Sequence, residues 1–190
     1  PIIQQQVVAI IQPLVHNQYT LELQTTITPT MASLTLNKTN FGFLAVRMAA
    51  NISDYFGGGI ITNQAGKTGE PALFGNAASY IDYSGPMRGP NANEITEGIT
   101  YFDHPSNPSY PSKWHIREDG WMGASVCRDA PITLTPNAPL KLRYLLHIHR
   151  DPLDHKIAKE LQQTFFQSPN WKVVKSQRRH RHHDILPVTE

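Results

Sequence analysis

The sequence predicts an all-β fold, an antiparallel β-sandwich, from three observations. Short runs rich in Val, Ile, Thr and aromatic residues recur along the chain, separated by clusters of Gly, Pro, Asn and Asp. Residues 140–149 alternate apolar and polar side chains, as a half-buried strand requires, with Leu145 the one exception. Only residues 152–166 carry a convincing helical pattern. We therefore expect a large sandwich of the jelly-roll or mutarotase-like kind with one C-terminal amphipathic helix.

The expected strands follow one another at short intervals. In chain order they are 2–15, 19–27, 32–36, 41–50, 59–62, 79–83, 98–103, 114–117, 132–134 and 140–149. The helix is expected to begin with Asp151 as its N-cap and Pro152 in its first turn. Its apolar residues recur every four positions and should pack against the sheet: Leu153, Ile157, Leu161 and Phe165.

Length and composition indicate one globular domain. A chain of 190 residues can bury a sizeable core without a disulfide, and the single Cys127 cannot form an internal bridge. The net charge of +2 is too small to predict a nucleic-acid partner. The apolar runs are strand-sized, well short of the roughly 20 residues that span a membrane. We expect one domain over residues 1–175 and a basic, flexible tail over 176–190, and the compartment stays open.

The segment 101–117 holds most of the candidate site residues. Its three prolines stiffen a connection between two strands, and rigid loops of this kind commonly carry binding or catalytic groups. Histidine exchanges protons near neutral pH, and arginine can bind a carboxylate or stabilise an oxyanion. The catalytic candidates are Asp103, His104, His115 and Arg117, and Asn107 is a candidate for ligand binding. In the alternative interpretation, the aspartate and asparagine cap turns and the histidines satisfy backbone carbonyls.

Two tryptophans near this segment suggest a carbohydrate ligand. Trp114 and Trp121 would offer flat apolar surfaces to the C–H faces of a sugar. Glu70 and Arg47 complete the candidate substrate-binding residues. Together with the histidines and Arg117, this set suits a sugar or uronate. Against it, tryptophans in sandwiches often belong to the core, and an arginine beside carboxylates often forms a structural ion pair.

A metal site is a further alternative. His147 and His149 share one strand face, a spacing that could bind zinc, iron or copper if a third ligand came from His104, His115 or Glu70. Two histidines near a strand end more often face solvent, so we assign no metal ligand. The sequence does not determine a cofactor.

A family resemblance rests on the central motif. Residues 103–117 read Asp-His-Pro-x-Asn-Pro-x-x-Pro-x-x-Trp-His-x-Arg. Further matching pieces lie at 42–48, 68–75, 81–85, 118–123 and 142–144. Over residues 18–150 the chain resembles the later portion of the PmoA-like family, a soluble bacterial family labelled after methane oxygenase. The resemblance implies a β-sandwich of uncertain activity. The histidine-pair region that precedes this portion in the family has no counterpart here.

Three function hypotheses follow. The leading one is a carbohydrate-handling protein that binds or modifies a sugar or uronate through a His/Asp/Arg pocket. The first alternative is a non-catalytic β-sandwich module for assembly, in which the Pro-rich motif is scaffold. The second is metal-dependent oxidation, as the family label suggests. The sequence leaves open whether the protein is an enzyme.

The apolar-rich opening, residues 2–15, predicts a partner chain. An unpaired strand edge exposes backbone donors and acceptors and invites another strand. We therefore expect a homodimer, or pairing with a missing N-terminal half. Pro13 would limit such pairing because it donates no ladder hydrogen bond.

Overall fold

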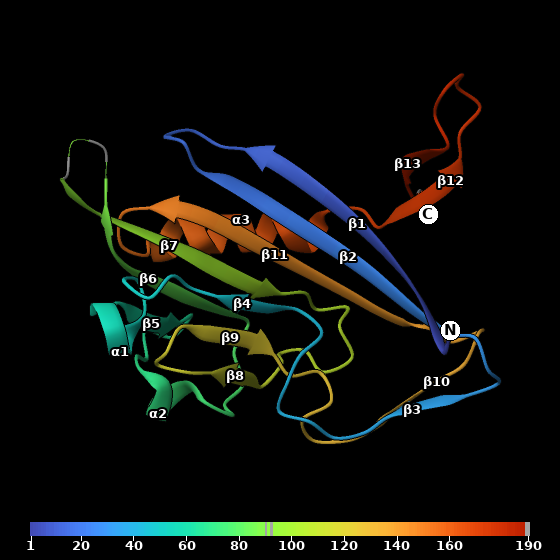
Figure 1. Ribbon diagram of the computed structural model, residues 1–190, viewed down its shortest axis with the longest axis horizontal. Coiled ribbons are helices and arrows are strands. Elements are labelled where there is room, and N and C mark those ends of the chain that lie inside the picture. Colours follow the sequence, from blue (N-terminus) through green and yellow to red (C-terminus); the bar gives the residue numbers. More distant parts are fainter. Residues whose placement is uncertain (90, 92, 189–190) are drawn as a thin grey trace.

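The computed structural model, which describes residues 1–89, 91 and 93–188, confirms an all-β fold with one C-terminal helix (Figure 1). The main sheet has six strands in the order β1-β2-β11-β7-β6-β5, all paired antiparallel. They are β1 (Ile3–Pro13), β2 (Tyr19–Pro29), β11 (Leu140–Arg150), β7 (Glu94–Asp103), β6 (Tyr80–Arg88) and β5 (Ile60–Asn63). A small sheet packs on one face of it: β4 (Ala45–Arg47), β9 (Trp121–Ala124) and β8 (Trp114–Ile116).

The remaining elements are short, except for one helix. Two further antiparallel pairs are β3 (Leu34–Leu36) with β10 (Ile132–Leu134) and β12 (Trp171–Lys175) with β13 (His183–Pro187). The helices are α1 (Asp54–Gly57), α2 (Glu70–Leu73) and α3 (His155–Gln167). Helix α3 runs along the face of the main sheet opposite β4, β8 and β9 (Figure 1). No helix in the described part of the chain is long and apolar enough to cross a membrane.

The main sheet is covered on both faces, so consecutive residues enter different cores. Tyr101 and Tyr144 point into the larger core shared with the small sheet, whereas Phe102 and Leu145 point toward α3. This explains Leu145, the apparent exception in an alternating strand. Arg143, His147 and His149 of β11 are buried as well, because the face expected to meet solvent lies under α3 and the segment after it. Lys141 stays exposed.

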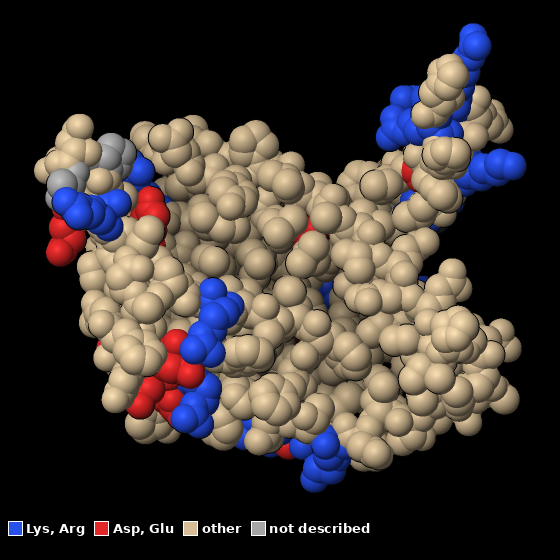
Figure 2. Space-filling view, viewed as in Figure 1, with Lys and Arg blue, Asp and Glu red and all other residues tan. Residues whose placement is uncertain are grey.

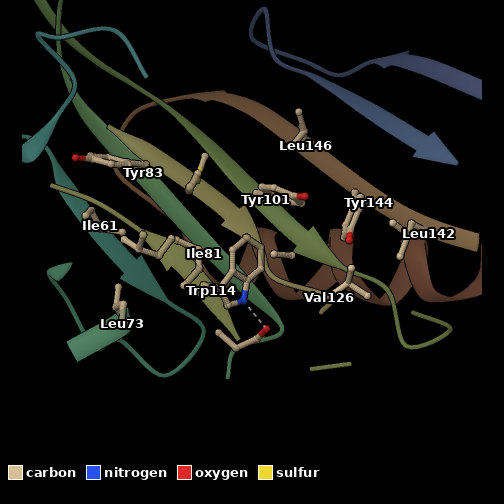
Figure 3. Packing of buried hydrophobic residues seen from close by; sticks show 14 of the residues in the cluster. Ile61, Leu73, Ile81, Tyr83, Tyr101, Trp114, Val126, Leu142, Tyr144 and Leu146 are labelled. Atoms are coloured by element: carbon tan, nitrogen blue, oxygen red, sulfur yellow. Dashed lines mark hydrogen bonds between the residues drawn. The ribbon is translucent and has the colours of Figure 1, made fainter. Parts of the chain in front are cut away.

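Trp114 lies at the centre of the larger core. Its side chain is fully buried, meets Tyr101 edge to face at 4.8 Å between ring centroids, and donates from Nε1 to the carbonyl of Ala78 at 2.9 Å (Figure 3). Tyr101 makes a similar contact with Tyr144 at 5.3 Å. Such edge-to-face pairs add to the free energy gained by burial alone. Trp114, expected to offer a surface to a sugar, is therefore a core residue.

Helix α3 begins later than the sequence indicated. Asp154, not Asp151, is the N-cap, and its Oδ1 accepts from the backbone N–H groups of Lys156 and Ile157. Asp151 has φ 69°, a left-handed turn conformation that cannot start a helix. The apolar stripe is also narrower than expected, because Ile157 is 43% exposed.

Two other segments differ from expectation. Of the expected strand 41–50, only β4 forms, and Phe41 and Phe43 lie in an irregular segment with exposed side chains. Residues 183–187, expected in a flexible tail, form β13 against β12, and Arg181 contacts Asp184 at 3.0 Å just beside it. A strand of five residues with one aliphatic pair leaves too weak a pattern to recognise among so many basic residues.

We expect Trp114→Ala to lower the free energy of unfolding by about 3 to 5 kcal/mol, because it opens a cavity in the larger core. Trp121→Ala, at a partly exposed site, should cost about 1 kcal/mol. Urea denaturation of both variants measures the difference. Equal losses would mean that Trp114 does not organise the core.

Candidate functional site

Asp103 closes the loop that follows β7. It is fully buried, and its two carboxylate oxygens accept from Asn107 Nδ2 at 2.7 Å and from the backbone N–H of Ser112 at 2.8 Å. Burial raises the pKa of Asp103, and the hydrogen bonds from Asn107 and Ser112 oppose that shift. Each carboxylate oxygen already holds a protein donor, so the geometry favours a structural role.

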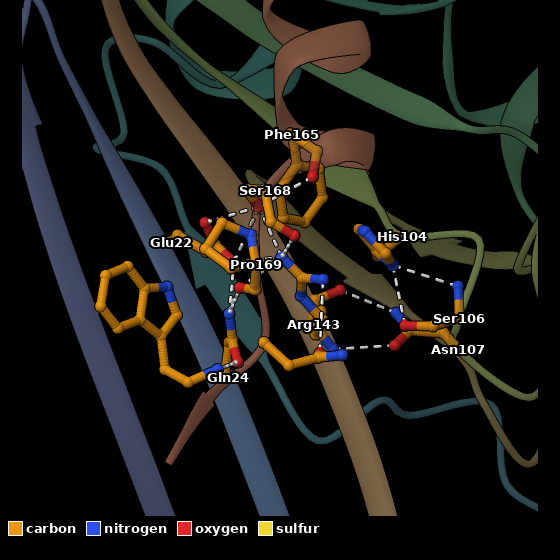
Figure 4. Close-up of polar contacts among 11 residues, drawn as sticks. Glu22, Gln24, His104, Ser106, Asn107, Arg143, Phe165, Ser168 and Pro169 are labelled. Carbon is orange, nitrogen blue, oxygen red and sulfur yellow. Dashed lines mark hydrogen bonds and ion pairs between the residues drawn. The ribbon is translucent and has the colours of Figure 1, made fainter. Parts of the chain in front are cut away.

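Asn107 extends the ladder between β7 and β11 beyond the end of β7. Its Nδ2 donates to the carbonyl of Arg143, and its Oδ1 accepts from the N–H of Arg143, both at 2.8 Å (Figure 4). In the register of the two strands, Arg143 would face residue 104. The amide side chain thus takes the place of a missing backbone partner.

His104 is enclosed between the loop and α3. Its Nδ1 accepts from the backbone N–H of Ser106 at 3.1 Å, and its ring meets Phe165 edge to face at 4.8 Å. Burial lowers the pKa of His104 to about 4, and the nearby charge of Arg143 acts in the same direction. The ring is therefore neutral and packed. Together with Asp103 and Asn107, it lies within the protein and away from the surface.

A buried ion pair stands beside these residues. Arg143 Nη2 contacts Glu22 Oε1 at 2.7 Å, and Ser168, which follows α3, accepts from Arg143 and donates to Glu22 (Figure 4). The two charged side chains are only 6% and 9% exposed. The pair joins β2, β11 and the end of α3. Sequence reasoning missed the pair because the alternation in residues 140–149 placed Arg143 on the polar face of its strand, and nothing singled out Glu22.

The other predicted residues come together at the surface, on the small sheet. In β8, Trp114 and Ile116 point inward, so His115 and the following Arg117 point outward. The N–H of Arg117 donates to the carbonyl of Trp121 at 2.9 Å, which closes the turn between β8 and β9. Arg47, at the end of β4, is paired with Trp121 in the ladder. We call His115, Arg117, Trp121, Glu70 and Arg47 the surface cluster.

Two ion pairs border the surface cluster. Arg117 Nε lies 3.4 Å from Glu70 Oε1, and Glu70 Oε2 accepts from the N–H of Glu118 at 2.7 Å. Arg47 Nη2 lies 3.3 Å from Asp119 Oδ2. The Arg47 and Arg117 side chains are 54% and 51% exposed. Figure 2 shows basic and acidic side chains next to one another over this part of the molecule.

Aromatic rings surround His115. Phe41 stacks on it at 4.8 Å with an interplanar angle of 19°, and Phe74 and Trp121 approach it at 5.3 and 6.2 Å. Phe41 is 55% exposed, so it presents its other face to solvent. Sequence reasoning missed both phenylalanines, because Phe41 was placed in a strand and nothing local linked either ring to His115.

Several polar atoms in and beside the surface cluster lack partners. Among the described residues, His115 Nδ1, Trp121 Nε1 and Arg128 Nη1 are buried without a hydrogen bond. Burial lowers the pKa of His115, and the charges of Arg117 and Arg128 lower it further. The imidazole is therefore neutral near pH 7, where it can accept as well as donate a hydrogen bond.

The histidines of β11 belong to a third group, under α3. His149 Nε2 donates to the fully buried Asp82 at 2.8 Å, and its Nδ1 donates to the carbonyl of Asp151 at 3.1 Å. Burial opposes a charge on His149, but the hydrogen bond and negative charge of Asp82 outweigh it and raise the pKa. His147 contacts Gln18, and burial together with His149 lowers its pKa to about 4. In the described part of the chain, no three His, Cys, Asp or Glu residues are arranged to hold a metal ion.

Residues 2–163 match the Family of unknown function (DUF6807), and the chain belongs to that family. This finding corrects the resemblance to the PmoA-like family. No curated protein and no solved structure matches the chain.

We expect Asn107→Ala to reduce the free energy of unfolding by about 3 kcal/mol, because it leaves both backbone groups of Arg143 and one oxygen of Asp103 without partners. Asn76→Ala, which removes an exposed side chain with one hydrogen bond, should cost less than about 1 kcal/mol. Chemical denaturation compares the two. An Asn107→Ala variant as stable as Asn76→Ala would argue against the structural role.

Stability should fall on both sides of an optimum near the ordinary histidine pKa. His104 and His147 have lowered pKa values, so the stability they contribute is present above the unfolded pKa and is lost as the pH falls toward 4. His149 has a raised pKa, so its contribution is present below the unfolded pKa and is lost as the pH rises through the folded value. Denaturation across pH should show both limbs, and His149→Gln should flatten the alkaline one. An unchanged alkaline limb in that variant would contradict the assignment.

Proposed function

We propose that this chain binds a sugar acid, such as a uronate, at the surface cluster. The observation that carries the proposal is the position of two half-exposed arginines, Arg47 and Arg117, beside the ring group of Phe41, His115 and Trp121. A uronate presents one carboxylate and one apolar C–H face. The arginines of the surface cluster can bind the carboxylate, and the aromatic rings can pack against the C–H face.

Arg117 supports the carboxylate contact. It meets Glu70 through Nε, and no other partner of its guanidinium is found in the described residues. The two terminal nitrogens are therefore available for a parallel pair of hydrogen bonds to a carboxylate. Glu70 is itself held by the N–H of Glu118, so it fixes the direction in which Arg117 extends.

The aromatic rings support the sugar contact. Phe41 and Trp121 meet at 6.1 Å with an interplanar angle of 80°, so their surfaces form an angled support. A sugar ring can pack its C–H groups on such faces while its hydroxyl groups meet polar side chains.

The arrangement supports binding better than turnover. Asp103 and His104, the expected acid and base, hold the loop against α3 and face protein groups on every side described above. Only His115 and Glu70 remain as titratable side chains in the surface cluster, and Glu70 is occupied with Arg117 and Glu118. We therefore propose a binding protein.

An assembly module is a second candidate function. It is favoured by a specific observation, the uncovered edge of the main sheet at β1, whose side chains are nearly all exposed.

We expect glucuronate and galacturonate to bind more tightly than glucose and galactose, measured by calorimetric titration. Arg117→Lys should weaken uronate binding about 10-fold and Arg117→Ala up to about 100-fold, since lysine keeps the charge but loses the planar pair of donors. Trp121→Ala should weaken both classes of sugar. Arg150→Lys is the matched control, because Arg150 forms a similar exposed pair with Glu97 elsewhere. Uronate binding that is unchanged in Arg117→Ala would contradict the proposal.

A further inference from the structure

Strand β1 leaves one edge of the main sheet open. It is the outermost strand of that sheet, and β2 is its one ladder partner among the residues that the structure describes. Nine of its 11 residues are exposed. Charged side chains, bulges and prolines are the usual devices that keep an edge from pairing with another strand. Strand β1 carries no Lys, Arg, Asp or Glu and no bulge in its register, and its one proline, Pro13, is its last residue.

The backbone groups that face outward can be identified. The carbonyl of Ile2 accepts from Thr30, and the N–H of Leu14 donates to Gln18, so even-numbered residues of this segment point toward β2 and its turn. Because the pointing direction alternates along a strand, the odd-numbered residues direct N–H and C=O to the open edge. These residues are Ile3, Gln5, Val7, Ala9 and Ile11.

The same odd-numbered residues continue the apolar face of the sheet. In register, Val7 is beside Thr25 and Leu142, and Ile11 is beside Leu21 and Leu146. Leu142 and Leu146 belong to the larger core, whereas Val7 and Ile11 are 48% and 68% exposed. The core face thus extends to β1 without a second layer. On the opposite face, Val8 is buried beside the segment that contains β12.

We infer that β1 pairs antiparallel with β1 of a second copy, across a two-fold axis at Val7. This register places Ile3 opposite Ile11 of the second copy and Gln5 opposite its Ala9, so each outward N–H meets an outward carbonyl. The pairing also joins Ile3, Val7 and Ile11 of both copies into one continuous apolar strip. Because β1 is uncharged, the two edges meet without like charges. Moving the two-fold axis by one residue, to Val8, would set Ile3 against Pro13, which has no backbone N–H to donate.

The inference is tested first by the oligomeric state of the 190-residue chain. Analytical ultracentrifugation across micromolar concentrations should show a monomer–dimer equilibrium. Val7→Lys places two lysines face to face at the axis and should weaken the dimer at least about tenfold. Ile60→Lys is the control, because Ile60 is 57% exposed on β5, the opposite edge of the same sheet. A wild-type monomer throughout, or equal effects of the two lysines, would overturn the inference.

Cysteine crosslinking tests the register. Paired residues that exchange hydrogen bonds have Cα atoms about 5.5 Å apart, within the range of a disulfide. Val7→Cys should therefore form an intermolecular disulfide rapidly under mild oxidation, and the buried Cys127 should not compete. In Gln5→Cys the two cysteines would lie four residues apart along the strands, about 13 Å. Crosslinking of Gln5→Cys as fast as Val7→Cys would overturn the proposed axis.

Discussion

The side chain of Asn107 continues the ladder of β11 after β7 has ended. The placement of the buried and of the exposed polar residues in segment 101–117 depends on this contact. Asn107 binds the backbone of Arg143, and Asp103 binds both Asn107 and the far end of the loop at Ser112. Asp103 thus holds both ends of the loop, residues 103 and 112, in place before β8 begins. From Trp114 onward, simple alternation sends Trp114 into the core and His115 and Arg117 to the surface.

Covering the main sheet on both faces creates a second requirement. Polar residues of β11 that would meet water in a one-sided sheet are buried and must find partners. Arg143 pairs with Glu22 and Ser168, and His149 pairs with Asp82. The contact with Ser168 attaches the end of α3 to the sheet, whereas the contact between His149 and Asp82 joins β11 to β6. The two arginines of the surface cluster are about half exposed, so water can hydrate the guanidinium nitrogens that their ion pairs leave unused.

The fold class followed from the sequence because strand alternation and turn residues are local signals. Residues 19–27 and 140–149 matched β2 and β11 closely for that reason. The start of α3 did not, since the left-handed turn at Asp151 is imposed by how β11 meets the helix. The predicted site residues divide into a buried part and an exposed part. That division depends on the packing of α3 against His104, and no spacing in the motif reports it.

We propose that Asp103, His104 and Asn107 hold the fold together, whereas His115, Arg117 and Trp121 contact a ligand. The chain has three tryptophans, so we expect three indole N–H signals in its NMR spectrum. Trp114 is in the core, Trp171 is on β12 and Trp121 is in the surface cluster. Titration with glucuronate should shift the Trp121 indole signal and leave those of Trp114 and Trp171 in place. A shift confined to Trp171, or no shift of any indole signal at saturating uronate, would contradict the account.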